Sequence, residues 1–143
     1  MFIGQYEHAV DQKGRVAIPS RFRKALKEGA ILTKGLDGCL FLFPKSKWLK
    51  LASDISRLPE TNSSARLYGR LIFAGATECE FDNQGRILLP QYLRKYSSIA
   101  RSAVVTGLYD RIEIWSKGNW DKYVEKNETK ATEIVESLSD VDI

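Results

Sequence analysis

The stretch Asp11-Gln-Lys-Gly-Arg15 recurs as Asp82-Asn-Gln-Gly-Arg86 in a chain of 143 residues. In both copies the aspartate can accept N–H groups of a tight turn, and the glycine can adopt the left-handed conformation that closes a hairpin. The stretches on either side of each copy have the composition of short strands, and a proline ends the second strand of each pair. Each copy therefore predicts a β-hairpin with this motif at its tip.

The repetition extends far beyond the two tips. Aligned positions are Val16 with Ile87, Ile18 with Leu89, Pro19 with Pro90, Phe22-Arg23-Lys24 with Leu93-Arg94-Lys95, Gly35-Leu36 with Gly107-Leu108, Leu40 with Ile112, Leu42-Phe43 with Ile114-Trp115, Lys45 with Lys117, and Trp48 with Trp120. About 45 residues recur with one small insertion, which indicates an internal duplication. A unit of that size buries little surface alone, so we expect two units to pack around a pseudo-two-fold axis, with their strands interleaved in one barrel-like core.

Each unit has the pattern strand–turn–strand–helix–strand–turn–strand. In the first unit Ser20 is the predicted N-cap of the helix and Gly29 its stop signal. Apolar residues at helical spacing predict further helices at 46–58, 65–76 and 117–138, and residues 59–64 have the composition of a linker. The predicted fold class is therefore α+β. The predicted parts are a first domain at 5–47, connecting helices and linker at 48–75, a second domain at 76–119 and a C-terminal helix at 120–143.

Charge is distributed unevenly along the chain. Residues 1–75 hold 13 Lys and Arg against 6 Asp and Glu, whereas residues 76–143 hold 9 against 12. The net charge of +4 is modest for a DNA-binding monomer, but an oligomer would multiply the positive field. The chain lacks an apolar run of the roughly 20 residues that a spanning helix needs, and its start lacks the features of a signal peptide. These features favour a cytoplasmic protein with nucleic acid as a partner.

The residue types that metal centres and enzymes need are scarce. One histidine, His8, and two cysteines, Cys39 and Cys79, fall short of a structural zinc site, and both cysteines are best interpreted as small buried apolar residues. Glu78, Glu80 and Asp82 alternate along a predicted strand, where pairing with basic residues is a simpler role than metal binding or acid–base chemistry. A glycine-rich phosphate loop and a nucleophile beside a base are both missing. We therefore expect no cofactor, no metal, no small-molecule substrate and no catalytic residue.

The doubled hairpin motif resembles the MraZ family of bacterial transcriptional regulators, and the flanking stretches at 1–15, 75–86 and 111–123 strengthen that resemblance over nearly the whole chain. The resemblance implies two AbrB-like swapped-hairpin domains per chain and assembly of many subunits into a homo-oligomeric ring. It also implies association with the nucleoid and repression of the cell division and cell wall operon, through double-stranded promoter DNA that carries short direct repeats.

The resemblance also implies which residues form the DNA face. These are Lys13, Gly14 and Arg15 in the first tip and Gln84, Gly85 and Arg86 in the second. An arginine fork suits guanine or phosphate, and a two-stranded ribbon fits the major groove. Asp11 and Asp82 would repel free phosphate, so their expected role is to hold the turn and to orient the arginine. Arg21, Arg23 and Lys24 either contact the DNA backbone or simply form a solvated helix face.

Two other interpretations remain open at this stage. The motif could be a device of the fold alone, with each aspartate–arginine pair closing its hairpin or bridging subunits. The protein could also be a structural ring-forming interaction module without direct DNA readout. In that case Trp48, Trp120, Tyr123 and an acidic C-terminal segment would serve a partner, although such aromatics more often pack against neighbouring helices. The acidic residues of this segment are Glu125, Glu128, Glu133, Glu136, Asp140 and Asp142.

Overall fold

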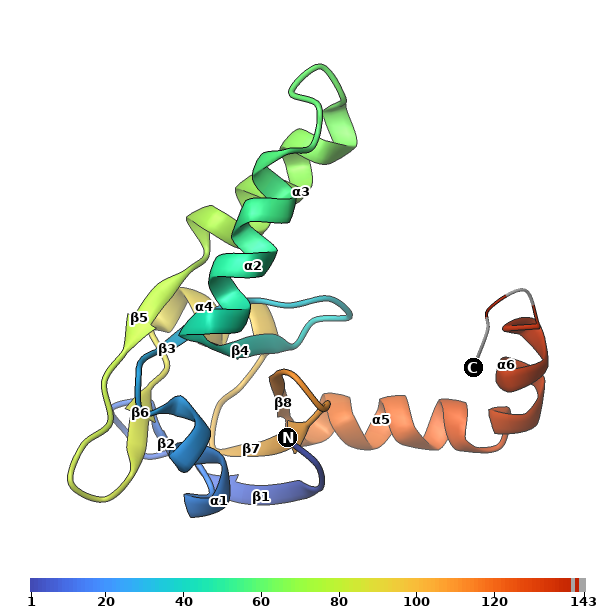
Figure 1. The fold of residues 1–143 in the computed structure, drawn as a ribbon. Coiled ribbons are helices and arrows are strands. Elements are labelled where there is room, and N and C mark those ends of the chain that lie inside the picture. The colour runs from blue at the N-terminus through green and yellow to red at the C-terminus, as the bar shows by residue number, and fades with distance from the viewer. Residues whose placement is uncertain (140, 142–143) are drawn as a thin grey trace.

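A computed structural model describes residues 1–139 and 141 of the chain (Figure 1). Its strands are β1 (Gln5–Ala9), β2 (Arg15–Ala17), β3 (Ala30–Lys34), β4 (Leu40–Pro44), β5 (Thr77–Cys79), β6 (Arg86–Leu88), β7 (Ser102–Gly107) and β8 (Ile112–Ser116). Its helices are α1 (Ser20–Arg23), η1 (Lys24–Leu26), α2 (Lys45–Ser56), α3 (Ser63–Ala74), α4 (Gln91–Ser97), α5 (Lys117–Glu128) and α6 (Ala131–Ser137). The mixture of helices with antiparallel strands confirms the predicted α+β class.

Strands of the two repeats interleave within one sheet. The six-stranded sheet has the order β1-β7-β8-β4-β3-β5, so β1 of the first repeat lies against β7 of the second, and β5 of the second lies against β3 of the first. The remaining strands, β2 and β6, pair with each other as a separate two-stranded ribbon. Neither repeat forms a sheet from its own strands alone.

The strand register reveals a pseudo-two-fold axis. In the ribbon Val16 pairs with Ile87, which is its equivalent in the other repeat. In the middle of the sheet Phe41 pairs with Glu113, and these two residues are equivalents as well. A residue that pairs with its own equivalent must lie beside the symmetry axis. The axis therefore passes through both the ribbon and the β4–β8 pair.

The main core lies between the ribbon and the sheet. Val16, Ile87, Leu42 and Ile114 are among its fully buried side chains. Phe22 of α1 contacts the rings of Phe2 and Tyr6 edge-on, and Leu93 of α4 is also buried in this core. The alternation that places Val16 and Ile18, or Ile87 and Leu89, on the inner face is the period-two pattern of a strand with one buried side.

The strands interleave as expected, but the predicted barrel-like core does not form a closed barrel among the described residues. The sheet has two edge strands, β1 and β5, and the ribbon is a separate two-stranded sheet that shares the main core with it. Closure fails because β2 and β6 are only three residues long and pair with each other. Contact between the ribbon and the sheet edge is limited, and it includes a single bridge between Val10 and Val16.

Two helical projections leave the body of the molecule in different directions (Figure 1). Helices α2 and α3 form a hairpin between the repeats, in which Trp48 contacts Phe73. Helices α5 and α6 form a C-terminal arm, whose base is attached where Trp120 and Tyr123 pack on Trp115. Trp48, Trp120 and Tyr123 therefore all take part in packing within the chain.

Two helix predictions were wrong in detail. Ser20 is the first residue of α1, not its cap, and α1 passes into the short helix η1 before Gly29. The single C-terminal helix predicted at 120–143 is divided into α5 and α6, and residues 140, 142 and 143 of that range lie outside the described part. Near the end of α5 the Asn127 side chain donates to the Tyr123 carbonyl at 2.8 Å. Such side-chain bonds compete with the backbone hydrogen bonds of the helix.

The described helices are each too short or too polar to span a lipid bilayer.

We expect the pseudo-symmetry axis to be the most sensitive part of the core. Ile87 is fully buried, so Ile87→Ala should lower the free energy of unfolding by about 2–5 kcal/mol. Its neighbour Leu88 is 52% exposed, so the matched variant Leu88→Ala should change the free energy by less than about 0.5 kcal/mol. Urea denaturation at one fixed protein concentration measures both. Equal losses in the two variants would contradict this description of the ribbon.

Candidate nucleic-acid interface

The first hairpin tip is organised by one carboxylate. Asp11 Oδ1 accepts the backbone N–H groups of Lys13 at 3.0 Å and of Arg15 at 2.8 Å, and its Oδ2 accepts Arg15 Nε at 2.7 Å. The Gly14 N–H donates to the Asp11 carbonyl at 2.9 Å, and Gly14 has a φ of 85°. Asp11 thus closes the turn and fixes the direction of the arginine that follows it.

The second tip repeats this geometry residue by residue. Asp82 Oδ1 accepts the N–H groups of Gln84 and Arg86, each at 2.9 Å, and its Oδ2 accepts Arg86 Nε at 2.8 Å. Gly85 has a φ of 73°. The conserved spacing of the five residues within this chain is therefore explained by one turn built twice.

Backbone hydrogen bonds cross between the two hairpins. The Ile18 N–H donates to the Gly85 carbonyl at 3.0 Å, and the Leu89 N–H donates to the Gly14 carbonyl at 2.8 Å. Arg86 Nη1 also reaches Asp11 Oδ2 at 3.4 Å, so one oxygen of Asp11 faces the arginines of both tips. These contacts place the two tips side by side and connect them through their charged groups.

An arginine of each repeat covers the glycine of the other repeat. Arg94 donates through Nε to the Leu89 carbonyl at 2.9 Å and lies against Gly14, where an added Cβ would come within 2.7 Å of that Nε. Arg23 donates to the Ile18 carbonyl at 3.2 Å and lies against Gly85 in the same way. Glycine is needed at positions 14 and 85 for the positive φ, and a Cβ at either position would also force the covering arginine to move.

The sequence did not predict that Arg23 and Arg94 each lie against the glycine of the opposite repeat. The alignment matches Arg23 with Arg94, which is a signal that the two share a role, but it does not reveal that each acts on the opposite repeat. Arg21, Arg23 and Lys24 were expected either to contact the DNA backbone or to form a solvated helix face. Arg23 is partly buried against the second tip, whereas Arg21 and Lys24 are exposed. Arg21 donates to the Tyr6 hydroxyl at 2.9 Å.

The charges of the paired tips do not cancel. Both carboxyl pKa values are held below their ordinary range, mainly by backbone N–H groups and then by the arginine side chain, so Asp11 and Asp82 are ionised at neutral pH. They balance the charges of Arg15 and Arg86. Lys13, Arg23 and Arg94 add three further positive charges in or against the two tips.

The two tip arginines are partly exposed. Their side chains are 34% exposed in Arg15 and 24% exposed in Arg86. Within the described part of the chain, the Arg15 side chain donates only through Nε, so both of its Nη groups can bind a ligand. Lys13 and Gln84 are exposed beside them at the outermost positions of the tips. This arrangement suits an extended anionic partner that several donors contact together.

The other candidate groups have structural surroundings. Cys39 and Cys79 are free thiols, and burial raises the pKa of the Cys39 thiol strongly and that of Cys79 to about 12. Thiols with raised pKa values are poor nucleophiles at neutral pH. Within residues 1–139 and 141, no three histidine, cysteine, aspartate or glutamate side chains lie close enough together to hold a metal ion, and this includes Glu78, Glu80 and Asp82.

Known proteins share both the repeat and the full length of this chain. The family model "MraZ protein, putative antitoxin-like" matches residues 1–71 and again residues 72–142. A protein of Heliobacterium modesticaldum is 46% identical over 143 residues, all of both chains. One of Carboxydothermus hydrogenoformans is 49% identical over 140 residues, and one of Desulforamulus reducens is 45% identical over 141, with coverage of 98% and 99% of both chains respectively. All three are named "Transcriptional regulator MraZ".

The two aspartates should make the protein sensitive to acid. A carboxyl whose pKa is lowered by folding stabilises the protein above its unfolded value of about 3.9, and this stability is lost as the pH falls through the folded value. The double variant Asp11→Asn/Asp82→Asn should therefore lose less stability than the unmodified chain between about pH 5 and pH 2. Urea denaturation at several pH values measures both slopes. Identical slopes would show that the carboxylates do not hold the turns.

Proposed function

This chain belongs to the MraZ family of transcriptional regulators, and from that premise we propose that it is a sequence-specific repressor that binds promoter DNA through its paired hairpin tips. A regulator of this family is not an enzyme, so the chemistry to explain is recognition. The observation that carries the proposal is the ribbon of β2 and β6, which holds both copies of the motif side by side.

Different groups of the face have different tasks in this proposal. Arg15 and Arg86 present guanidinium groups to base edges or phosphates, and Lys13 binds phosphate as a point charge. Asp11 and Asp82 do not touch DNA but hold the arginines in place before binding, which reduces the entropy lost on binding. Gly14 and Gly85 are buried under Arg94 and Arg23, so their part in the proposed DNA face is indirect: they close the turns that present the arginines.

The two tips are not chemically equal. The first tip carries Lys13 where the second carries Gln84. Arg86 also contacts Asp11 of the other tip, and within the described part of the chain Arg15 makes no matching contact with Asp82. A lysine favours phosphate, whereas a glutamine can donate to and accept from the edge of adenine. We infer that the first tip contributes more of the affinity and the second more of the base selectivity.

The domain arrangement follows the same proposal. We take residues 5–47 and 76–119 as two AbrB-like units that exchange hairpins, joined by residues 48–75 and followed by residues 120–143. Three observations support an exchange: β1 pairs with β7, β5 pairs with β3, and the tip glycines accept N–H groups from the opposite repeat. Each pairing joins one repeat to the other.

For the assembly and the target, we propose a homo-oligomeric ring in the bacterial cytoplasm, associated with the nucleoid. The ring would repress the operon for cell division and cell wall synthesis by binding short direct repeats in its promoter. A chain with a net charge of +4 gains affinity when several copies bind one DNA together, because each further contact becomes intramolecular.

Removal of the tip arginines tests the proposal. The variant Arg15→Ala/Arg86→Ala should bind promoter DNA at least about tenfold more weakly, since one bidentate base contact is worth about 1–3 kcal/mol. Gel-shift titration measures the affinity. The matched control is Arg57→Ala, which removes an exposed arginine at the far end of α2 and should leave the affinity unchanged.

The same experiment separates this function from that of a purely structural ring. Size-exclusion chromatography must show that the double variant keeps its oligomeric state. An intact oligomer with full affinity would remove both arginines from the DNA face. The absence of any promoter binding at low salt would favour an interaction module without DNA readout, because phosphate contacts are strongest there.

Ring geometry also predicts the spacing of the operator. Successive subunits that present their ribbons to the same side of a duplex should contact direct repeats about one helical turn apart, near 10 bp. Footprinting on promoters whose repeat spacing is varied measures this. Affinity should fall when the spacing is changed by half a turn and recover at a full turn. A footprint that is indifferent to spacing would contradict the ring arrangement.

A further inference from the structure

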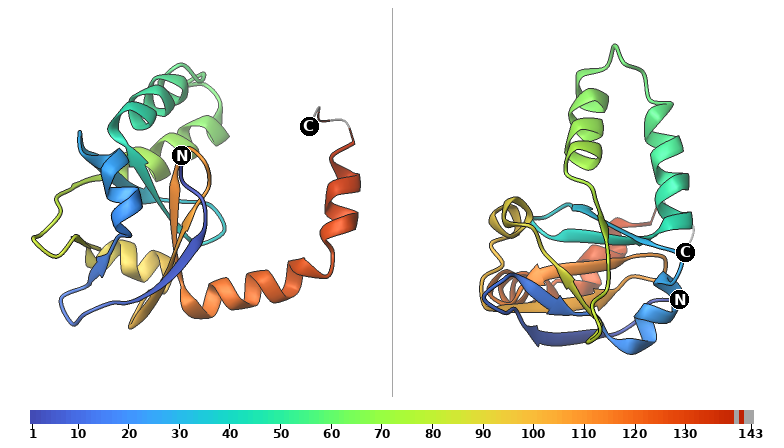
Figure 2. Two further views of the ribbon diagram at one scale, coloured as in Figure 1. Left: turned by 60° about the horizontal axis from the view of Figure 1, so that its bottom comes forward. Right: turned by 90° about the vertical axis from the view of Figure 1, so that its left-hand side faces the viewer.

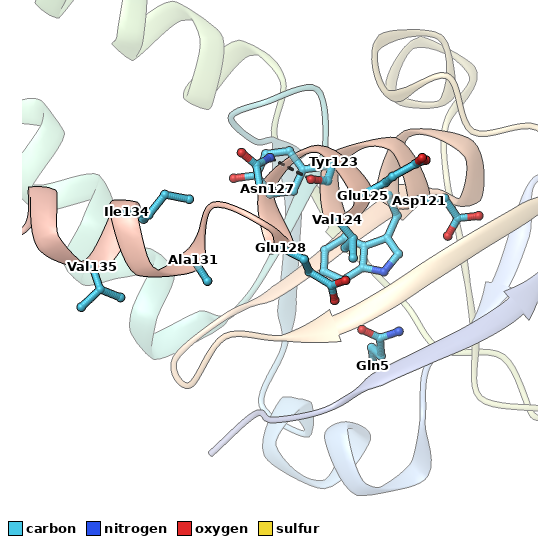
Figure 3. A pocket seen from close by; sticks show the side chains of 11 residues that line it. Gln5, Asp121, Tyr123, Val124, Glu125, Asn127, Glu128, Ala131, Ile134 and Val135 are labelled. Atoms are coloured by element: carbon cyan, nitrogen blue, oxygen red, sulfur yellow. Dashed lines mark hydrogen bonds between the residues drawn. The ribbon is translucent and has the colours of Figure 1, made fainter.

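The C-terminal arm encloses a groove that the proposed DNA face does not use. The groove lies between α5, α6 and the start of β1, with a volume of about 720 Å³ (Figure 3). Its apolar lining includes Trp120, Tyr123, Val124, Ile134 and Val135. An apolar hollow of this size on a projecting arm is typical of a surface that binds a helix or a chain segment.

Helix α6 lacks the packing that would stabilise it within one chain. It is only seven residues long, and every residue from Ala131 to Ser137 is exposed. Ile134 is 43% exposed and Val135 is 63% exposed. Isolated helices shorter than about 12–15 residues are marginal in water, so α6 needs a partner against its apolar side.

A complementary surface exists on the other projection. Along one face of α3 lie Arg66, Leu67, Arg70 and Phe73, at helical spacing. Leu67 is 69% exposed and Phe73 is 41% exposed. This face, which we call the α3 stripe, therefore combines apolar anchors with two positive charges.

The charges of the groove are opposite in sign to those of the stripe. Glu125 and Glu128 line the groove, while its third acid, Asp121, is already paired with Lys117 at 2.7 Å. Among the described residues, Glu125 and Glu128 have no ion pair of this kind, so Arg66 and Arg70 of a stripe would meet two carboxylates beside the apolar lining. Complementary charge of this kind sets the register of an interface and disfavours a groove-to-groove contact.

The structure assigns the occupant of the groove: we propose that the α5–α6 groove of one copy receives the α3 stripe of a neighbouring copy. The two surfaces lie on projections that point in different directions, so they do not meet within one chain (Figures 1 and 2). A contact between two different surfaces is heterologous, and its repetition generates a ring or a filament. The inference rests on the oligomer proposed above and names the surfaces that build it.

Complementary variants test the pairing. Leu67→Glu places a carboxylate on the stripe, Val135→Glu places one in the groove, and both positions are exposed, so the fold of each copy should be unchanged. Each variant alone should lose the oligomer and sediment as a single copy. A mixture of the two still contains one intact stripe and one intact groove, so it should form a species of two copies. Leu49→Glu, at an exposed leucine of α2 outside the stripe, is the matched control and should remain oligomeric.

Sedimentation velocity gives the readout, with circular dichroism to verify the fold. An oligomer that survives in either single variant would overturn the assignment of this interface and leave the ring itself intact. A mixture that stays at one copy would also overturn it. If the unmodified chain sediments as one copy, both this interface and the proposed ring fail, whereas the affinity of a single ribbon for DNA is measured independently.

Discussion

The exchange of backbone hydrogen bonds between the two hairpins is the constraint on which the rest of the structure depends. Ile18 donates to Gly85 and Leu89 donates to Gly14, while Val16 packs beside Ile87 at the symmetry axis. A buried N–H or carbonyl without a partner is costly, so neither ribbon strand is stable without the other. One chain therefore keeps two copies of the motif because each copy completes the fold of the other.

That constraint also determines how the tips are presented. The ribbon is short, but its tips are held from both sides: from within by an aspartate, and from the other repeat by Arg23 or Arg94. Asp11 faces both tip arginines, so a change at one tip is felt electrostatically at the other. In the proposed function, tips that are held in place before binding would lose little entropy on contact with DNA, and the two tips would act as one recognition unit.

Much of this architecture could be predicted from the sequence, because the signals are local. The glycine and aspartate of each motif indicate the turn, alternation indicates the strands, and the alignment of Val16 with Ile87 indicates the duplication. The family resemblance was confirmed by the comparisons. The features that could not be predicted depend on contacts distant in sequence: the pairing of β5 with β3, the open sheet where a barrel was expected, and the covering of Gly14 by Arg94. The break between α5 and α6 was missed because neither proline nor glycine marks it.

The central claim is that both tips of one chain contact DNA together. A structure of the assembled protein on promoter DNA tests this most directly, because it measures the distances from the guanidinium groups of Arg15 and Arg86 to the duplex. The account predicts that both groups lie within hydrogen-bonding distance of base edges or phosphates in the same groove. DNA bound at another surface, or at one tip with the other facing solvent, would contradict it.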